Sequence, residues 1–384
     1  MVFVVVHYSE IGTKGKNRTY FENILVRNIK NSFREKLKKV FKRYGRIVCE
    51  FNDFVEKNEI MKGLSVIPGI ANFSFAEVSS KNLEDIQNKS LQIMKNLFFS
   101  SFKVHTTRSD KSFHLNSLQI NETIGDFLSK CLEKKVNLSS PDVTLFIEIG
   151  EKEVFLYTEK IKGIGGLPVG ASGKVLCSLS GGIDSPVASY LMMKRGCKVH
   201  FVHFFNELEK HKGAYQSKIN EIVSILTKFQ GKSKLFLVPF GEIQKEIIIH
   251  CPSEYRMILY RRVMIKILNL LAKREKAKAI VTGDNLGQVA SQTLENLRCI
   301  YSLSDFPIIH PLIGFNKEEI IELAKKIGTY SSSIKDYVDC CSFLISKHPS
   351  TKTSYERIKH IESNIKEMEN LIERAINEMK CVTF

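Results

Sequence analysis

The chain has 384 residues, more than a single hydrophobic core usually supports, so we expect two or three domains. Hydrophobic residues make up 43% of the chain, which excludes a globally disordered protein. The formal net charge of +16 points to a polyanionic partner such as nucleic acid. No apolar run approaches the ~20 residues of a membrane-spanning helix, so we expect no membrane partner.

The cysteine content and the amino end indicate a cytoplasmic protein. Nine cysteines are scattered over the chain, too sparsely for a disulfide framework. No C-x-x-C pair occurs, which argues against a zinc ribbon and against an evident iron–sulfur site. Residues 1–7 are apolar but lack the basic leader and cleavage site of a signal peptide, so we expect a first strand there.

The first two domains are expected over residues 1–55 and 56–160. In the first, the pattern predicts a strand over 1–7, a basic amphipathic helix over 20–40 and a strand over 47–55. In the second, it predicts helices over 59–66, 83–99 and 117–135, with strands over 70–78, 101–108, 143–149 and 154–157. These elements indicate an α+β fold on a mostly antiparallel sheet.

A glycine-rich linker is expected over 161–173, followed by a third domain over 174–384. Apolar runs predict strands over 175–179, 198–204, 234–239 and 279–282, with helical patterns between them. This alternation is typical of an α/β fold with a doubly wound parallel sheet, in which ligands bind beyond the carboxyl ends of the strands. Residues 354–379 are predicted to form one charged amphipathic helix.

The most informative motif is the turn Ser180-Gly181-Gly182-Ile183-Asp184-Ser185, between the strand 175–179 and a helix with Pro186 in its first turn. Adjacent glycines let the backbone approach a ligand closely, and the helix adds its partial positive charge, so the turn suits a pyrophosphate. It is not a Walker A loop, because the Lys-Ser/Thr pair is missing. It resembles the PP-loop of ATP pyrophosphatases, which release pyrophosphate while adenylating a substrate oxygen. Asp184 is also the candidate Mg²⁺ ligand.

Other candidate residues lie near the predicted strand ends. His203 and Phe204 end the second strand, where a nucleotide could pack, although such residues are as often plain core. Arg261 lies on a predicted helix and suits a phosphate clamp, and Lys317 near a helix start suits neutralisation of charge on phosphorus. For both cations, a solvated helix face is the alternative.

Three blocks resemble tRNA 4-thiouridine synthetases along essentially the whole chain: residues 9–18, residues 162–166 with 180–188, and residues 283–293. The resemblance implies a ferredoxin-like domain, a THUMP RNA-binding domain and a PP-loop catalytic domain, in that order. It implies ATP contacts at Ser178, Leu179, His203, Phe204, Arg261, Gly283 and Gln292, beside the turn residues Ser180, Gly181, Gly182, Asp184 and Ser185. Asp184 and Lys317 match positions that the family uses for adenylation.

The resemblance also implies the reaction. O4 of uridine 8 in tRNA attacks ATP, with Mg²⁺ as cofactor, and a sulfur nucleophile then displaces AMP to give 4-thiouridine. Cys340 or Cys341 matches the family's catalytic cysteine, and the choice between them stays open; without the resemblance, adjacent cysteines are more often buried thiols. A role in making the thiamine thiazole, known for some relatives, stays open as well.

The carboxyl end of the chain bears on the sulfur source. Some relatives append a rhodanese-like domain, for which the chain, ending at Phe384, leaves no room. We therefore expect sulfur from a separate persulfide carrier, such as a cysteine desulfurase or a stand-alone rhodanese, from inorganic sulfide, or through a second thiol such as Cys197. A cluster formed by Cys251 with the cysteine pair stays open.

Basic residues of the amino-terminal segment are the candidates for binding tRNA phosphates, although a solvated helix face would account for about half of them. The predicted set is Lys14, Lys16, Arg18, Arg27 and Lys30. We expect a homodimer, in which one subunit holds the tRNA on which the other subunit acts.

Two alternatives remain beside the thiolating enzyme. One is a PP-loop enzyme that uses ammonia on a small substrate, which the cysteine pair and the basic amino-terminal region oppose. The other is a non-catalytic tRNA-binding protein with a vestigial nucleotide site, which the intact turn, Lys317 and Gln292 oppose.

Overall fold

The computed structural model describes residues 2–384 except 44, 207–213, 336–345 and 347. The chain divides into two compact units, Met1–Pro168 and Val169–Phe384, and each is described by itself. Among the described residues, no helix has both the length and the apolar character needed to cross a membrane.

The first unit is built on one sheet with the strand order β2-β3-β1-β4-β8-β7-β5-β6, in which β9 also pairs with β4. Its elements are β1 (Val2–His7), α1 (Arg18–Phe33), β2 (Leu37–Arg43), β3 (Arg46–Phe51), α2 (Lys57–Ser65), β4 (Asn72–Ser79), α3 (Leu83–Lys95), β5 (Ser101–Arg108), α4 (Ser117–Leu132), β6 (Lys135–Val136), β7 (Val143–Ile149), β8 (Val154–Tyr157) and β9 (Ile161–Lys162).

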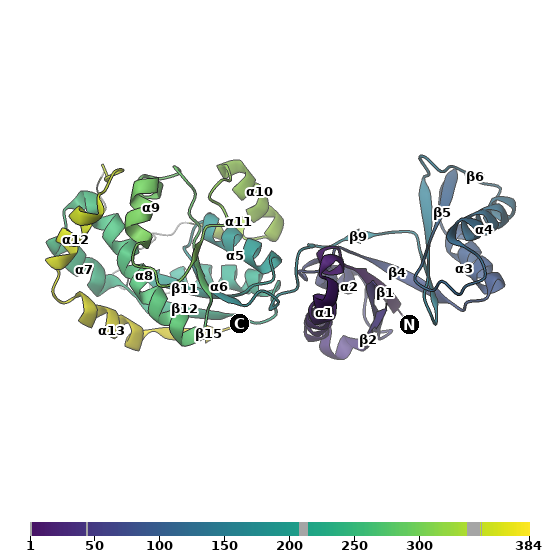
Figure 1. The fold of residues 1–384 in the computed structure, drawn as a ribbon, viewed down its shortest axis with the longest axis horizontal. Helices are drawn as coiled ribbons and strands as arrows, with labels where there is room; N and C mark the ends of the chain where they lie inside the picture. Colours follow the sequence, from purple (N-terminus) through teal and green to yellow (C-terminus); the bar gives the residue numbers. More distant parts are fainter. Residues whose placement is uncertain (1, 44, 207–213, 336–345, 347) are drawn as a thin grey trace. The chain divides into compact units, whose positions relative to one another are not determined.

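Two of the hydrophobic cores along this sheet are covered by helices. Helices α1 and α2 pack on the strands around β1, and α3 and α4 pack on the strands around β5 (Figure 1). Strand β4 links the two parts, since it pairs with β1 and then, through residues 77–79, with β8. Most pairs are antiparallel as expected, but β5 pairs in parallel with β6 and β7, because α4 forms a crossover between them.

Three expectations for this region need correction. The helix predicted over 20–40 ends at Phe33, where Arg34 takes a positive φ of 41°, and β2 follows. The boundary expected after residue 55 falls inside the first core, because Ile60 and Leu64 of α2 belong to that core. The start of the expected linker over 161–173 is β9, which pairs with β4.

The second unit contains a sheet with the strand order β14-β13-β10-β11-β12-β15. Its elements are β10 (Lys174–Ser178), α5 (Asp184–Lys194), β11 (Lys198–Phe205), α6 (Ala214–Thr227), β12 (Lys234–Pro239), α7 (Gly241–His250), α8 (Arg256–Glu275), β13 (Ala279–Val281), α9 (Leu294–Tyr301), β14 (Ile308–Ile309), α10 (Lys317–Ile327), α11 (Tyr330–Ser333), α12 (Tyr355–Ser363), α13 (Met368–Glu378) and β15 (Lys380–Thr383).

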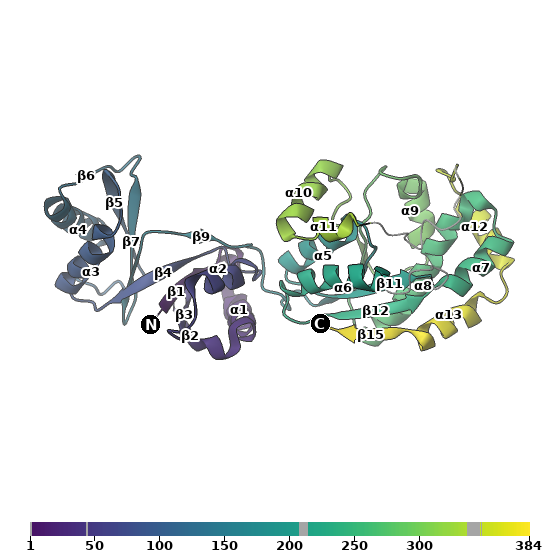
Figure 2. The same cartoon turned by 180° about the vertical axis from the view of Figure 1, so that it is seen from behind.

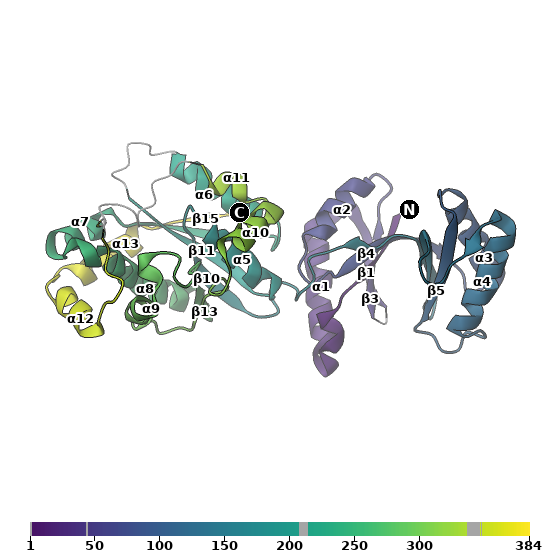
Figure 3. The same ribbon diagram turned by 90° about the horizontal axis from the view of Figure 1, so that it is seen from above.

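This sheet is parallel and doubly wound, as the sequence predicts, with one antiparallel strand, β15, at its edge. Helices α5 and α6 lie on one side of it and α8 and α9 on the other (Figure 3). The chain winds outward in opposite directions from β10, so the switch point lies between β10 and β13. Ligands of such sheets bind beyond the carboxyl ends of the strands at this point.

The tail differs from the single helix predicted over 354–379. It forms two helices, α12 and α13, and then the edge strand β15 beside β12 (Figure 2). Ile361, Ile365 and Met368 are all buried in one core, so the apolar stripe continues across the break between the helices. The helical spacing of the apolar residues therefore continues across the break between α12 and α13, so the sequence pattern did not reveal that break.

Candidate active site

A tight turn joins β10 to α5 and forms one wall of the site. The Ser180 amide donates to Ser185 Oγ over 2.9 Å, the two serine hydroxyls are 3.0 Å apart, and the Gly182 amide donates to Ser180 Oγ over 3.3 Å. Among the described residues, no side chain caps the start of α5. The first-turn N–H groups of α5 therefore remain available to an anion.

A second turn approaches this one closely. Gly283 follows β13, and a Cβ placed on it would lie 2.7 Å from the Ser185 nitrogen and 3.0 Å from the Asp184 carbonyl carbon. Only glycine allows this approach without a shift of backbone. The turns after β10 and β13 thus meet at the switch point of the sheet.

Asp184 is held by two donors from distant parts of the chain. Lys317 Nζ, at the start of α10, donates to Asp184 Oδ1 over 2.6 Å, and Gln288 Nε2 donates to Oδ2 over 3.0 Å. The Lys317 side chain is 42% exposed. A partly exposed ammonium group at the edge of an anion-binding turn can reach a phosphate brought into it.

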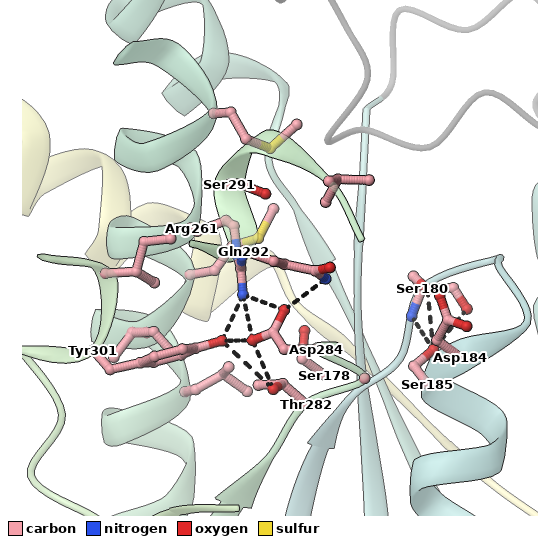
Figure 4. A pocket seen from close by; sticks show the side chains of 17 residues that line it. Ser178, Ser180, Asp184, Ser185, Arg261, Thr282, Asp284, Ser291, Gln292 and Tyr301 are labelled. Carbon is pink, nitrogen blue, oxygen red and sulfur yellow. Dashed lines mark hydrogen bonds and ion pairs between the residues drawn. The ribbon is translucent and has the colours of Figure 1, made fainter. Parts of the chain in front are cut away.

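Asp284 is the centre of the opposite wall (Figure 4). Arg261 donates through one nitrogen to both carboxylate oxygens of Asp284, each over 2.6 Å, and to the Tyr301 hydroxyl over 2.5 Å. The Tyr301 hydroxyl donates to Asp284 as well. Thr282 Oγ1 donates to Asp284 Oδ2 over 2.9 Å, and Gln292 Nε2 donates to Oδ1 over 3.1 Å.

The electrostatics of this wall fix the protonation states. Burial alone would raise the pKa of Asp284, but Arg261 and Tyr301 outweigh it and hold that pKa below its usual value. Burial raises the pKa of Tyr301 well above its usual value. At neutral pH, Asp284 is therefore an anion that only accepts, and Tyr301 keeps the proton that it donates.

A cavity of about 240 Å³ lies between the two walls. Apolar side chains of α8 and α9 line one part of it: Met257, Met264, Ile265, Leu268 and Ile300. Seven of the residues predicted from the sequence to bind ATP line it too: Ser178, Ser180, Asp184, Ser185, Arg261, Gly283 and Gln292. An apolar cavity with a few convergent polar groups is the usual form of a nucleotide-sized site.

The other residues predicted from the sequence are not among the described residues that line the cavity. Gly181 and Gly182 belong to the turn but are not among the lining residues. His203 is buried, with its Nδ1 2.8 Å from the Leu179 carbonyl oxygen, and Phe204 packs edge-on against Phe240 in the core. Cys340 and Cys341 lie outside the described residues.

Several site residues were absent from the sequence-based set. Asp284, Thr282, Tyr301, Gln288 and His310 all contribute to the two walls. For Asp284, the signal was present, because it is an acidic residue directly after a predicted strand. For Tyr301, at the end of α9, we find no sequence signal.

The predicted RNA-binding residues fall into two groups. Lys16, Arg27 and Lys30 are exposed, and Lys14 lies over the Phe21 ring at 5.4 Å. Arg18 differs, because its guanidinium donates to Glu22 over 3.0 Å and to the Tyr8 hydroxyl over 2.7 Å. The positive charge of Arg18 is therefore partly balanced within the unit by Glu22.

Known proteins resemble the chain over nearly all of its length. Residues 3–74 match the model of the ThiI ferredoxin-like domain, 80–159 that of the THUMP domain, and 170–367 that of the thiamine biosynthesis protein ThiI. A probable tRNA sulfurtransferase of Thermoanaerobacter sp. (strain X514) is 39% identical over 97% of this chain and 98% of its own.

Two further relatives agree. A probable tRNA sulfurtransferase of Geobacillus kaustophilus is 40% identical over 98% of this chain and 94% of its own. The crystal structure of a 4-thiouridine synthetase–RNA complex with bound ATP superimposes with a TM-score of 0.91 at 36% identity, covering 100% of both chains.

Proposed function

Because the chain belongs to the ThiI family of tRNA sulfurtransferases, we propose that it adenylates O4 of uridine 8 in tRNA and replaces this oxygen by sulfur, giving 4-thiouridine. The chain is an ATP-dependent, sulfur-transferring enzyme that acts on tRNA. The observation that carries the finer proposal is the turn over 180–185, with Asp184 and Lys317 at its edge, facing a cavity.

In the first step, uracil O4 forms a bond to the α-phosphorus of ATP. The bond between the α-phosphorus and the oxygen that bridges to the β-phosphorus breaks, and pyrophosphate leaves with the electron pair. The proton on N3 of the uracil passes to solvent. The amides of the turn and the start of α5 hold the phosphates, and Lys317 neutralises the charge that develops on them. Arg261 and Gln292 hold the remainder of the nucleotide in the cavity.

Asp184 is the residue that would hold Mg²⁺. The donor set fits this ion, because Mg²⁺ is usually bound by one or two carboxylates together with substrate phosphates. Within the described ranges, no three or more His, Cys, Asp or Glu residues gather into a group that could hold a metal ion. When bound, the ion supplies positive charge to the phosphate oxygens.

In the second step, a sulfur nucleophile adds to C4 and the C4–O4 bond breaks, so that AMP leaves with the former O4. With free sulfide as the donor, this displacement gives 4-thiouridine directly. With a persulfide on Cys340 or Cys341, loaded by a separate carrier, the base is first joined to the cysteine by an S–S bond. A second thiol then attacks the cysteine sulfur, 4-thiouridine leaves with the electron pair of the S–S bond, and a thiol reductant reduces the disulfide that remains. Cys197 and Cys251 are poor candidates for the attacking thiolate. Burial raises the pKa of both, that of Cys251 to about 12, and the thiolate is the reactive form.

The remaining parts of the proposal concern assembly and setting. The exposed cations of α1, Arg27 and Lys30, would bind tRNA phosphates. We further propose a homodimer in the cytoplasm, and a second use of the same sulfur transfer in thiamine thiazole synthesis.

The test is product formation in a defined mixture. The protein is incubated with unmodified tRNA, ATP–Mg²⁺ and sulfide, and the digested RNA is examined for 4-thiouridine by mass spectrometry. We expect 4-thiouridine, AMP and pyrophosphate from wild-type tRNA and none from tRNA with cytidine at position 8. Thiolation that persists at another uridine of the variant tRNA would contradict the choice of target.

A further inference from the structure

Asp284 lies between two side chains that reach the cavity, and it constrains both. Its carboxylate accepts from Arg261 on one side and from Gln292 on the other, and Figure 4 shows these residues converging on it. The Asp284 side chain is only 6% exposed, so its two oxygens interact mainly with these protein donors.

The amide of Gln292 has a defined direction because of this contact. An ionised carboxylate has no proton to donate, so the group that faces Asp284 must be the Nε2 donor. Gln292 Oε1 must then point the other way. This oxygen is buried and has no hydrogen-bond partner among the described residues, while the side chain lines the cavity. A buried acceptor without a partner is costly unless a ligand satisfies it.

Asp284 is itself held in place. The Tyr301 hydroxyl and Thr282 Oγ1 both donate to it, and His310 Nδ1 lies 2.8 Å from Thr282 Oγ1. Because the Thr282 proton goes to Asp284, His310 is the donor to Thr282. Thr282 and Tyr301 line the cavity themselves, while His310 holds Thr282 from outside the lining residues. Such a supporting network sets the geometry of a binding group.

We propose that Asp284 is a positioning residue that sets the polarity of the nucleotide site: it holds the Arg261 guanidinium at the cavity and orients Gln292 so that Oε1 accepts from a hydrogen-bond donor of ATP. That donor is a ribose hydroxyl or the adenine amine. The inference rests on the proposed binding of ATP in this cavity, but not on the thiolation reaction.

The test is the binding of ATP and three analogues, measured by calorimetry without tRNA. The analogues are 2′-deoxy-ATP, 3′-deoxy-ATP and purine riboside triphosphate, each of which lacks one donor. We expect wild-type protein to bind one of them about tenfold more weakly than ATP, and this analogue identifies the donor.

The isosteric variant Asp284→Asn separates a positioning role from a structural one. The introduced side-chain amide can donate to Gln292 Oε1, which reverses the Gln292 amide. We expect weaker ATP binding, by about 30-fold or more, and loss of the wild-type preference between ATP and that analogue. The matched control Asp305→Asn, at an exposed position of the same unit, should bind all four nucleotides as wild type does.

The outcomes are distinct. Equal weakening of all four nucleotides in Asp284→Asn would overturn the inference in favour of a structural role. Should this variant fail to fold, Gln292→Ala gives the decision: loss of the preference supports the inference, and its retention contradicts it. No ATP binding by wild-type protein would reject the proposed function together with the inference.

Discussion

Each unit of the molecule contains a nearly buried carboxylate with several donors, and the two differ in what lies beside them. In the first unit, Glu148 of β7 accepts from His7 of β1 over 2.7 Å, from Tyr157 of β8 over 2.6 Å and from Arg46 of β3. Together with β7 itself, four strands of one sheet take part, so Glu148 joins the two parts of that sheet.

Asp284 has four such donors, and all of them line a cavity: Arg261, Thr282, Gln292 and Tyr301. A buried carboxylate network is therefore not by itself a sign of function. Both networks contain a buried polar atom for which the described residues offer no hydrogen-bond partner, His7 Nδ1 beside Glu148 and Gln292 Oε1 beside Asp284. What distinguishes Asp284 is that Gln292 lines a cavity, where a ligand can satisfy its Oε1. Substitutions in each unit can separate the two roles.

The largest effect is expected at the close approach between the two turns of the site. In Gly283→Ala, the new Cβ would meet backbone atoms of residues 184 and 185, so the turns must separate. We expect thiolation to fall about 1000-fold or more, because misplaced catalytic groups lose their orientation. The matched control is Gly314→Ala, where the added Cβ meets nothing within 4 Å. Equal activity of the two variants would contradict the assignment of the site.

A smaller loss is expected for Lys317→Ala. Lys317 is partly exposed and bonded to Asp184, so its removal should leave the fold intact. We expect kcat for AMP formation to fall about 100-fold, with ATP affinity changed by less than about threefold, because the charge acts mainly in the transition state. Steady-state kinetics would check this, and a rise in KM at constant kcat would assign Lys317 to ground-state binding instead.

Glu148→Gln tests the structural half of the comparison. The change leaves the Arg46 side chain, which is only 11% exposed, beside an uncharged partner, and this should destabilise the first unit by about 2–4 kcal/mol. Burial lowers the pKa of His7 to about 4, so His7 is neutral at neutral pH and adds no second positive charge beside Arg46. Thermal unfolding and ATP calorimetry should show a lower transition temperature with unchanged ATP affinity, whereas exposed Glu151→Gln should change neither. Loss of ATP binding in Glu148→Gln would remove the distinction between the two carboxylates.

The exposed cations of α1 should contribute modestly to tRNA binding. We expect Arg27→Ala with Lys30→Ala to weaken binding about tenfold and to reduce the slope of log K against log salt by about 2. Binding measured across a salt series would check both values. An unchanged slope would place the tRNA phosphates on another surface.

The smallest expected effect is the pH dependence of the stability that Asp284 contributes. The pKa of Asp284 is lowered on folding, so its stabilising contribution is complete above the unfolded pKa of about 3.9 and is lost as the pH falls through the folded value. The difference in unfolding free energy between wild type and Asp284→Asn should therefore be constant near neutrality and shrink below about pH 4. Urea unfolding followed by circular dichroism measures this difference. A difference that grows with acid would mean that Asp284 is not the anion described.

The sequence alone predicted those parts of the site whose residues are contiguous in the chain. The turn over 180–185 is contiguous and follows a continuous apolar strand, so its residue types and its place in the sheet were both predictable. The contacts of Asp284 could not be predicted from the sequence. Arg261 and Tyr301 lie 23 and 17 residues away from it in the chain, and only the packing of α8 and α9 brings them to it.

The errors in the fold have a related origin. Leu37 and Val40 are three residues apart, which is a helical spacing. Pairing with β3 makes the segment a strand, and a register shift between Leu37 and Lys39 lets both side chains pack on the same core. The break between α12 and α13 leaves the apolar stripe uninterrupted, since residues on both sides of it face the same core. Local pattern therefore identified most elements, while tertiary pairing and packing set their ends.

The fate of the oxygen that leaves the base decides most directly whether the uridine is adenylated. The protein is given tRNA whose target uridine carries ¹⁸O at O4, together with ATP–Mg²⁺ and sulfide, and the AMP that forms is analysed by mass spectrometry. We predict one ¹⁸O atom in the phosphate of AMP for each 4-thiouridine, because O4 bonds to phosphorus before it leaves carbon. Unlabelled AMP beside labelled water would contradict this mechanism, since the oxygen would then have left without adenylation.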